Sequence, residues 1–455
     1  MPAELRFTAE QHNKLLRHLL ADDDEHAAVL MCGTARNRPE LLLCHQVVPL
    51  TAADLEASSG RLHLEVSPLT IARLAKQAKA DGRTLVVCHS HPFHGPVQAS
   101  SIDLETEFDL CGRVLPGRLA GRPVGALIVG PDGFEARVWM DRASSALHLR
   151  VGGRLIDNGD DNADPTFGDE RDARHLLVWG LAGQTRLQRA SVVIVGAGGT
   201  GSHLVLQLAH LGIGRLVLVD PDIVEPSNLG RLVGATTADV GRRKVEVLAS
   251  TAARIRPEIV VESIAASVLD IDAKTLAGND LIVCCTDGHG SRSLLNELAA
   301  QYVMTLVDLG IEVQSAREAT RAGGGVRIVR PGEPCLNCMD VLDPGLVRED
   351  FLSDAQQRDE SKRGYLRGNA EPAPSVIALN GVVASLAVLE VLHELLGLFA
   401  SSPHRVLYRA EARSVTTADA TSRDTCYVCG PAGISGLGDA RRLPRRPSEP
   451  RTGSG

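Results

Sequence analysis

The fold of this chain is decided by residues 190–201, ASVVIVGAGGTG. The apolar run 190–195 predicts a buried strand, and the turn after it leads into an apolar stretch, 202–211, that predicts a helix. A backbone without Cβ can approach a phosphate closely, and the free N–H groups that begin the next helix attract an anion. We therefore predict an α/β, Rossmann-like doubly wound fold whose nucleotide-binding glycines are Gly196, Gly198, Gly199 and Gly201.

A carboxylate follows the next predicted strand. Asp220 comes directly after the apolar run 215–219, about where a ribose-binding carboxylate belongs. This pattern alone also fits a nicotinamide or flavin dinucleotide, or a strand-to-helix turn that binds nothing.

The polar residues further along favour ATP over a dinucleotide. Asn228 and Arg231 lie in the segment DPDIVEPSNLGR, residues 220–231, and Lys244 opens another predicted helix. Hydride transfer needs no such cations, whereas attack of a carboxylate on the α-phosphorus of ATP builds negative charge that Arg, Lys and Mg²⁺ must stabilise. Asp287 ends the apolar run 281–285 at the expected carboxyl edge of the sheet, where it is placed to hold Mg²⁺.

From about residue 171 to 430 the chain resembles the ThiF/MoeB family of adenylyltransferases, relatives of the ubiquitin-activating enzymes. The resemblance rests on five segments: RDARH at 171–175, GAGGTG at 196–201, residues 220–231, GRRK at 241–244 and CTD at 285–287. It implies that Asp220 holds the ribose, that Asn228, Arg231 and Lys244 hold the phosphates, and that Asp287 holds Mg²⁺. It also implies a homodimer in which Arg174 reaches across as an arginine finger. Leu232 departs from the glutamine that the family usually has after the arginine.

Two cysteine pairs predict a structural zinc site. Cys335 and Cys338 are spaced as CxxC, and so are Cys426 and Cys429. The two thiolates of one pair can bind the same Zn²⁺ ion, and the second pair supplies the other two ligands of a tetrahedral site. The alternatives are a redox CxxC or a chance spacing, although a redox motif needs only one pair.

The amino-terminal third predicts a second metal site. His89 and His91 end the apolar run 84–88, and Asp103 follows a dozen residues later. Imidazoles at i and i+2 on a strand share one face, and a carboxylate as third ligand leaves the fourth position for water, as in catalytic zinc sites. Glu25, at the start of another apolar run, could act as general base to that water. The acidic residues 22–24 before it are also typical of a solvated helix end.

Residues 5 to 145 resemble the JAMM (MPN-domain) metalloproteases, which cleave isopeptide or peptide bonds after ubiquitin-like proteins. The resemblance implies that His89, His91 and Asp103 bind zinc, that Glu25 is the base and that Ser100 stabilises the oxyanion. His91 and Ser100 are one residue further apart than is usual in the family, which leaves Ser101 as an alternative to Ser100. A metal-free, degenerate relative is the other interpretation.

Length and composition fit two compact catalytic domains, since the chain has 455 residues and 44% apolar content. We predict a JAMM/MPN-like mixed α/β domain over 1–150, a linker over 151–168, a ThiF/MoeB-like domain over 169–435 and a basic disordered tail over 436–455. The net charge of −8 argues against nucleic acid as the main partner. The longest apolar region, 375–399, contains polar residues and predicts a packed helix, not a membrane span. No secretory signal begins the chain, and thiolate ligands favour the cytoplasm.

Together these observations predict a bifunctional enzyme that processes and adenylates the terminal glycine of a ubiquitin-like protein. An alternative is adenylation of a sulfur-carrier protein, ending in a thiocarboxylate. A nucleotide-binding scaffold with inactive sites is an alternative of another class. Residues 339–374 contain no cysteine that could take the adenylate as a thioester, so the expected acceptor is external, such as a conjugating enzyme or a sulfurtransferase.

Overall fold

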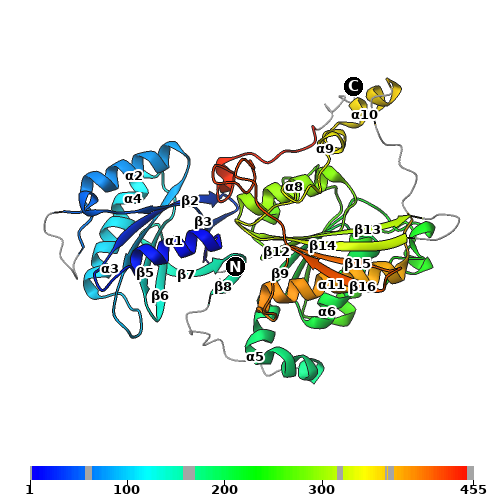
Figure 1. The fold of residues 1–455 in the computed structure, drawn as a ribbon, viewed down its shortest axis with the longest axis horizontal. Helices are drawn as coiled ribbons and strands as arrows, with labels where there is room; N and C mark the ends of the chain where they lie inside the picture. Colours follow the sequence, from blue (N-terminus) through cyan, green and yellow to red (C-terminus); the bar gives the residue numbers. More distant parts are fainter. Residues whose placement is uncertain are drawn as a thin grey trace. The chain divides into compact units, whose positions relative to one another are not determined.

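The computed structural model describes residues 3–56, 64–156, 170–314, 321–363, 366 and 374–447. They form two compact units, and each unit has a sheet of its own (Figure 1). Unit 1 comprises Met1–Ala163 together with two later pieces, Ala300–Val303 and Ile434–Arg442. Unit 2 comprises Asp164–Ala299, Met304–Gly433 and Leu443–Gly455. The two later pieces of unit 1 were not predicted from the sequence.

Unit 1 is a mixed α/β fold around one sheet. Its strand order is β1-β3-β2-β4-β5-β6-β7-β8, and β1 also pairs with β7, so the first seven strands close into a ring. Its elements are β1 (Ala3–Phe7), α1 (Ala9–Leu19), β2 (Ala27–Ala35), β3 (Arg38–Pro49), α2 (Pro68–Ala80), β4 (Thr84–Ser90), α3 (Ser101–Glu107), a π-helical turn (Phe108–Val114), α4 (Leu115–Arg118), β5 (Val124–Gly130), β6 (Gly133–Met140), β7 (Ala143–Val151) and β8 (Arg154–Ile156).

Both faces of the sheet of unit 1 are buried. Along β2, Ala28 and Leu30 belong to the core cluster that includes Leu15 and Leu19 of α1. Val29 and Met31 belong to a second cluster with residues of α2 and α4. Alternate side chains of a strand point to opposite faces, so a nearly continuous apolar run is what such a strand requires.

Two of the predicted domain boundaries differ from the structure. β7 and β8 extend to Ile156, because the strand pair Leu149–Ile156 continues the sheet into the expected linker; residues 157–169 lie outside the described residues. The expected disordered tail is structured from 436 to 447, where Gly438–Ala440 form a 3-10 turn. Gln301 Nε2 donates to the Gly438 carbonyl at 2.6 Å, and a Cβ on Gly33 would clash with the Gly436 carbonyl oxygen. These contacts hold residues 436–442 in unit 1, whereas the residues from Leu443 on belong to unit 2.

Unit 2 confirms the predicted Rossmann-type core and extends it. The strand order is β11-β10-β9-β12-β13-β14-β15-β16, parallel from β11 to β13 and antiparallel from there on. The strands are β9 (Ser191–Val195), β10 (Arg215–Val219), β11 (Val260–Ile264), β12 (Leu281–Cys284), β13 (Thr305–Gln314), β14 (Arg321–Val329), β15 (Arg405–Arg409) and β16 (Ser414–Ala418). The helices are α5 (Ala173–Arg189), α6 (Gly199–Leu211), α7 (Lys244–Ile255), α8 (His289–Gln301), α9 (Pro344–Asp350), α10 (Asp354–Lys362) and α11 (Ile377–Leu396).

α11 is the helix predicted from the apolar region 375–399. Among the described residues it alone is long and apolar enough to cross a membrane, and 56% of its most apolar window is buried within the protein. Val383 and Ala387 belong to the main core cluster of unit 2. Its buried polar residues have partners: Glu394 accepts from Arg330 Nε at 2.8 Å, and His393 Nε2 lies 2.6 Å from Ser402 Oγ. α11 is a packed core helix in this fold, as predicted.

Candidate functional site

The glycine turn lies between β9 and α6, and its glycines are needed for different reasons. Gly196 has a φ of +99°, and a Cβ there would lie 2.9 Å from the Cys285 carbonyl. A Cβ on Gly201 would overlap the Gly196 carbonyl oxygen. Gly198 has no neighbour within 4 Å of its Cβ position, so it faces open space beside the start of α6. Packing of the turn therefore requires Gly196 and Gly201, and Gly198 leaves the room that a phosphate would need.

Asp220, the predicted ribose ligand, is buried directly after β10. Its Oδ2 accepts from Ala197 N at 2.7 Å and its Oδ1 accepts from Asp222 N at 2.8 Å. Burial raises the pKa of Asp220, and these two backbone donors counter that shift. The carboxylate therefore ties the glycine turn to the segment that follows β10.

Lys244, at the start of α7, is paired with a residue that the sequence did not single out. Its Nζ donates to Asp222 Oδ2 at 2.8 Å, and the Lys244 side chain is 10% exposed whereas that of Asp222 is 60% exposed. The predicted phosphate contact of Lys244 would therefore compete with an ion pair. No local pattern in the sequence marks this pair, because the two residues are 22 positions apart.

Asn228 and Arg231 lie in and just after a 3-10 turn near the glycine turn. Asn228 is buried, and its Oδ1 accepts from Glu225 N at 3.1 Å, so its amide oxygen is used locally. Arg231 Nη1 donates to the Ser227 carbonyl at 3.0 Å, and Arg231 Cδ lies 3.5 Å from the Cβ position of Gly199. Arg231 is thus beside the first residue of α6. Leu232, in the place of the family glutamine, is buried against Val224 and Val247, which explains an apolar residue there.

Asp287 is exposed just after β12. β12 lies beside β9, with Cys284 opposite Val195, and Thr286 Cγ2 lies 3.2 Å from the Cβ position of Gly196. Because β10, β9 and β12 are neighbours in the parallel part of the sheet, Asp220, the glycine turn and Asp287 share its carboxyl edge. Lys244 lies at the same edge because it pairs with Asp222, two residues after Asp220. Arg231 lies there because its Cδ is next to Gly199 of the glycine turn. Arg174 is exposed in the first turn of α5, and its role across a dimer stays a prediction.

Asn380 of α11 is a neighbour of the glycine turn that sequence reasoning missed. It is buried, its Nδ2 donates to Ser375 Oγ at 3.1 Å, and the same Nδ2 fills the space that a Cβ on Gly199 would need. In the sequence it looked like an interruption of an apolar helix. A lone amide in such a helix is a weak signal, because only the packing of α11 on α6 brings it to the turn.

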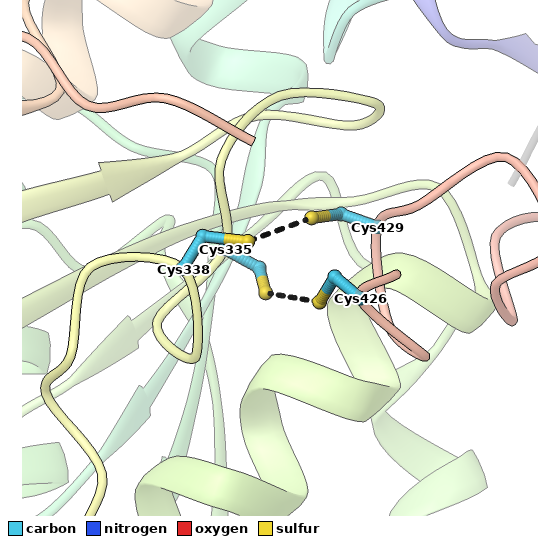
Figure 2. A group of neighbouring side chains, drawn as sticks. All are labelled: Cys335, Cys338, Cys426 and Cys429. Carbon is cyan, nitrogen blue, oxygen red and sulfur yellow. Dashed lines mark hydrogen bonds between the residues drawn. The ribbon is translucent and has the colours of Figure 1, made fainter. Parts of the chain in front are cut away.

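The four predicted zinc-binding cysteines come together in unit 2 (Figure 2). Their Sγ atoms all lie within 4.8 Å of one another, with Cys335 and Cys426 at 3.6 Å and Cys338 and Cys429 at 3.5 Å. Four thiolates about 2.3 Å from one Zn²⁺ ion would be about 3.8 Å apart, so the cluster fits a tetrahedral site and not disulfides. The interaction between the two thiols lowers the pKa of Cys335 and raises the pKa of Cys429, so the two share a proton when no metal is bound.

The Cys335→Ser variant is expected to lose one zinc ion per chain and to lower the melting temperature of the protein by roughly 5 to 10 °C, because a zinc ion in this cluster would join segments 91 residues apart. Zinc analysis and thermal unfolding of the purified variant measure both effects. Cys111→Ala is the control for zinc content, since Cys111 is buried in unit 1. Because three thiolates can still hold zinc, an unchanged zinc content in the double variant Cys335→Ser and Cys426→Ser is the result that would show that the cluster holds no metal.

The predicted ligands of unit 1 also converge. His89 Nε2 lies 3.3 Å from His91 Nε2, and the two nitrogens lie 3.4 and 3.5 Å from the two carboxylate oxygens of Asp103. Burial, and then the nearby His89, lower the pKa of His91, so this imidazole favours the neutral form that binds metals. Two ring nitrogens that face each other and a carboxylate offer three ligand atoms to one ion.

Neighbouring strands and a helix cap fix this group. His89 pairs with Ala27 of β2 and Ile128 of β5, and His91 N donates to the Val129 carbonyl at 2.9 Å. Glu25 precedes Ala27 by two residues, which places it beside the end of β4 that carries the histidines. Ser100 is the N-cap of α3: its Oγ accepts from Asp103 N at 3.1 Å and its N donates to Asp103 Oδ2 at 2.7 Å. The observed role of Ser100 is therefore to orient Asp103, and the oxyanion role stays a prediction.

Comparison with known proteins identifies the family of unit 2. A model described as "ThiF family" matches residues 171–428. The SAMP-activating enzyme E1 of Haloferax volcanii is 30% identical over 276 residues, which cover 59% of this chain and 92% of that protein. Molybdopterin-synthase adenylyltransferase of Escherichia coli is 30% identical over 54% of this chain and 90% of that protein. Adenylyltransferase and sulfurtransferase MOCS3-1 of Zea mays is 31% identical over 55% of this chain but only 50% of that protein. The matched range covers more than half of the chain and contains the whole glycine-turn site, so this protein belongs to the ThiF family.

Proposed function

We propose that unit 2 adenylates the carboxyl-terminal glycine of a ubiquitin-like protein, consuming ATP and releasing pyrophosphate. The observation that carries this proposal is the grouping of Asp220, Arg231, Lys244 and Asp287 around the glycine turn at one edge of the sheet. The names of the relatives support it, because they describe adenylyltransferases and an enzyme that activates a small protein.

Each residue has a chemical role in this reaction. The substrate carboxylate forms a bond to the α-phosphorus, the bond from that phosphorus to the bridging oxygen breaks, and pyrophosphate leaves. Arg231, beside the start of α6, would stabilise the charge that develops on the phosphates. Lys244 would do the same after exchanging Asp222 for phosphate, and Asp220 would accept from the ribose. Asp287 would hold Mg²⁺, which neutralises phosphate charge when bound.

Unit 1 is proposed to be a metallopeptidase that exposes this glycine. His89, His91 and Asp103 would hold a zinc ion, which lowers the pKa of a bound water to about 7. Glu25 would take a proton from the water as its oxygen bonds to the carbonyl carbon of the glycine, and would give that proton to the amine that leaves when the C–N bond breaks. Cleavage after a terminal glycine creates the carboxylate that the adenylating unit consumes, and joining both units in one chain raises the local concentration of that product.

The fate of the adenylate separates conjugation from sulfur transfer. Burial raises the pKa of the thiols of Cys32, Cys88, Cys111, Cys284 and Cys285, so these cysteines are poor nucleophiles. Because residues 339–374 also lack cysteine, we propose an external acceptor: a conjugating enzyme or a sulfurtransferase. Adenylation of a sulfur carrier is the second candidate function, since the names of relatives include a molybdopterin-synthase adenylyltransferase and a sulfurtransferase.

We also propose a homodimer. Arg174 is exposed in the first turn of α5, where Leu177 is 87% and Val178 69% exposed. In a dimer these neighbouring apolar side chains beside Arg174 would be covered by the second copy of the chain. Sedimentation of the full chain as a monomer at micromolar concentration would contradict this proposal.

The proposed activity is tested by ATP–pyrophosphate exchange with a ubiquitin-like protein that ends in glycine. We expect exchange that depends on that protein and disappears when its terminal glycine is removed. Mass spectrometry of the products then distinguishes a thiocarboxylate from a conjugate. Absence of exchange with every such protein encoded near this gene, together with fewer than two zinc ions per chain, would favour an inactive nucleotide-binding scaffold.

A further inference from the structure

The basic segment near the carboxyl end binds acidic residues of its own unit. Arg446 N donates to the Leu269 carbonyl at 2.9 Å, and Arg446 Nη1 lies 3.4 Å from Asp270 Oδ2. Arg445 Nε donates to the Asp270 carbonyl at 3.0 Å. These arginines therefore bind the segment that follows β11, through two backbone carbonyls and the carboxylate of Asp270.

Arg446 also reaches the end of α9. Its Nε and Nη2 donate to the Asp350 carbonyl at 3.2 and 3.1 Å, and its side chain is 25% exposed. A guanidinium that donates two N–H groups to one carbonyl oxygen fixes both the distance and the orientation of that carbonyl. The carboxyl-terminal segment thus fixes the backbone of Asp350, the last residue of α9.

The side chain of Asp350 in turn holds the first turn of α8. Its Oδ2 accepts from Gly290 N at 2.7 Å and lies 3.2 Å from the Cβ position of Gly288, the residue after Asp287. A carboxylate is favoured at this end of a helix. His289 Nδ1 also accepts from Asp343 N at 3.1 Å, so α9 is anchored to the start of α8 at both of its ends.

We propose that Arg446 and Asp350 are positioning residues that hold the loop carrying Asp287 in place for Mg²⁺. Arg446 fixes the backbone of Asp350, the carboxylate of Asp350 fixes Gly288–Gly290, and that turn sets where Asp287 presents its oxygens. Metal ligands require a supporting shell that fixes them to within about 0.5 Å. This inference rests on the proposed adenylation for its kinetic consequence, and its structural content can be measured without activity.

The test uses the full chain with Arg446→Ala and Asp350→Ala, and Arg442→Ala as an exposed arginine of the same segment. Loss of a hydrogen bond to a charged group predicts that both variants need about tenfold more Mg²⁺ for half-maximal pyrophosphate exchange. Affinity for ATP measured without Mg²⁺ should stay unchanged. Asp350→Asn keeps an acceptor oxygen for Gly290 N, so it should restore most of the Mg²⁺ response, which a general loss of folding would not allow.

Hydrogen exchange provides a second measurement that needs no turnover. Amides of residues 287–292 should exchange about tenfold faster in Arg446→Ala and Asp350→Ala than in the wild type, and at the wild-type rate in Arg442→Ala. If both alanine variants keep wild-type exchange of these amides, the positioning role is wrong. If the wild type shows no pyrophosphate exchange but the amides respond as expected, the positioning role stands and the proposed function fails.

Discussion

The Arg231→Ala variant is expected to lose roughly 10²- to 10³-fold in the rate of ATP–pyrophosphate exchange, the usual effect of removing one group that stabilises transition-state charge. Arg231 lies against the Gly199 position at the start of α6, where the phosphates would bind, and its guanidinium donates to the Ser227 carbonyl nearby. The loss should appear mainly in kcat. Arg231→Lys should recover only part of the rate, because an ammonium cannot form two parallel hydrogen bonds.

Arg242→Ala is the matched control, since Arg242 is exposed and paired with Asp239 at 2.6 Å on the same stretch of chain. It should keep nearly full activity. Equal rates for Arg231→Ala and the wild type would remove Arg231 from the site. Equal losses in both arginine variants would point to folding instead of catalysis.

The Glu25→Gln variant is expected to lose about 10²- to 10⁴-fold in peptide-bond cleavage while keeping its zinc, because glutamine cannot accept the proton of a metal-bound water. Glu25 lies two residues before Ala27, the register partner of His89. The substrate is a ubiquitin-like protein extended by a peptide after its terminal glycine. Cleavage is followed by mass spectrometry, with zinc content measured in parallel.

Asp23→Asn tests whether another acidic residue nearby acts as the general base, since Asp23 is exposed in the acidic run before Glu25. It should cleave at the wild-type rate. His91→Ala should lose both activity and one zinc ion. Cleavage by Glu25→Gln at the wild-type rate would show that another residue is the base. If the wild-type protein itself cleaves no such substrate, the function proposed for unit 1 is wrong.

Much of the site could be predicted because it is encoded in short segments. The run from Ser191 to Gly201 is a strand, turn and helix whose geometry local residue types dictate. His89 and His91 share a face because side chains alternate along β4. Each CxxC pair presents two thiols from one turn, so only the meeting of the two pairs had to be inferred.

Other features depend on segments distant in the sequence and could not be predicted in this way. Asp350 meets Gly290 across 60 residues, and Asn380 meets Gly199 across a longer gap. The prediction of a disordered tail from 436 was wrong up to 447, because composition shows that a segment is basic and proline-bearing but not that its backbone fits against Gly33 or that Arg446 meets Asp350.

By itself, the sequence determined the strand–turn–helix unit, the parallel core around it and the residue types available to each site, because these follow from side-chain periodicity and from backbone freedom at glycine. Only the tertiary structure decided which partners those residues have: Lys244 with Asp222, Leu232 in a small core, and the carboxyl-terminal segment divided between the two units. Such partners are set by how whole helices and strands pack, and packing depends on the shapes of many side chains at once.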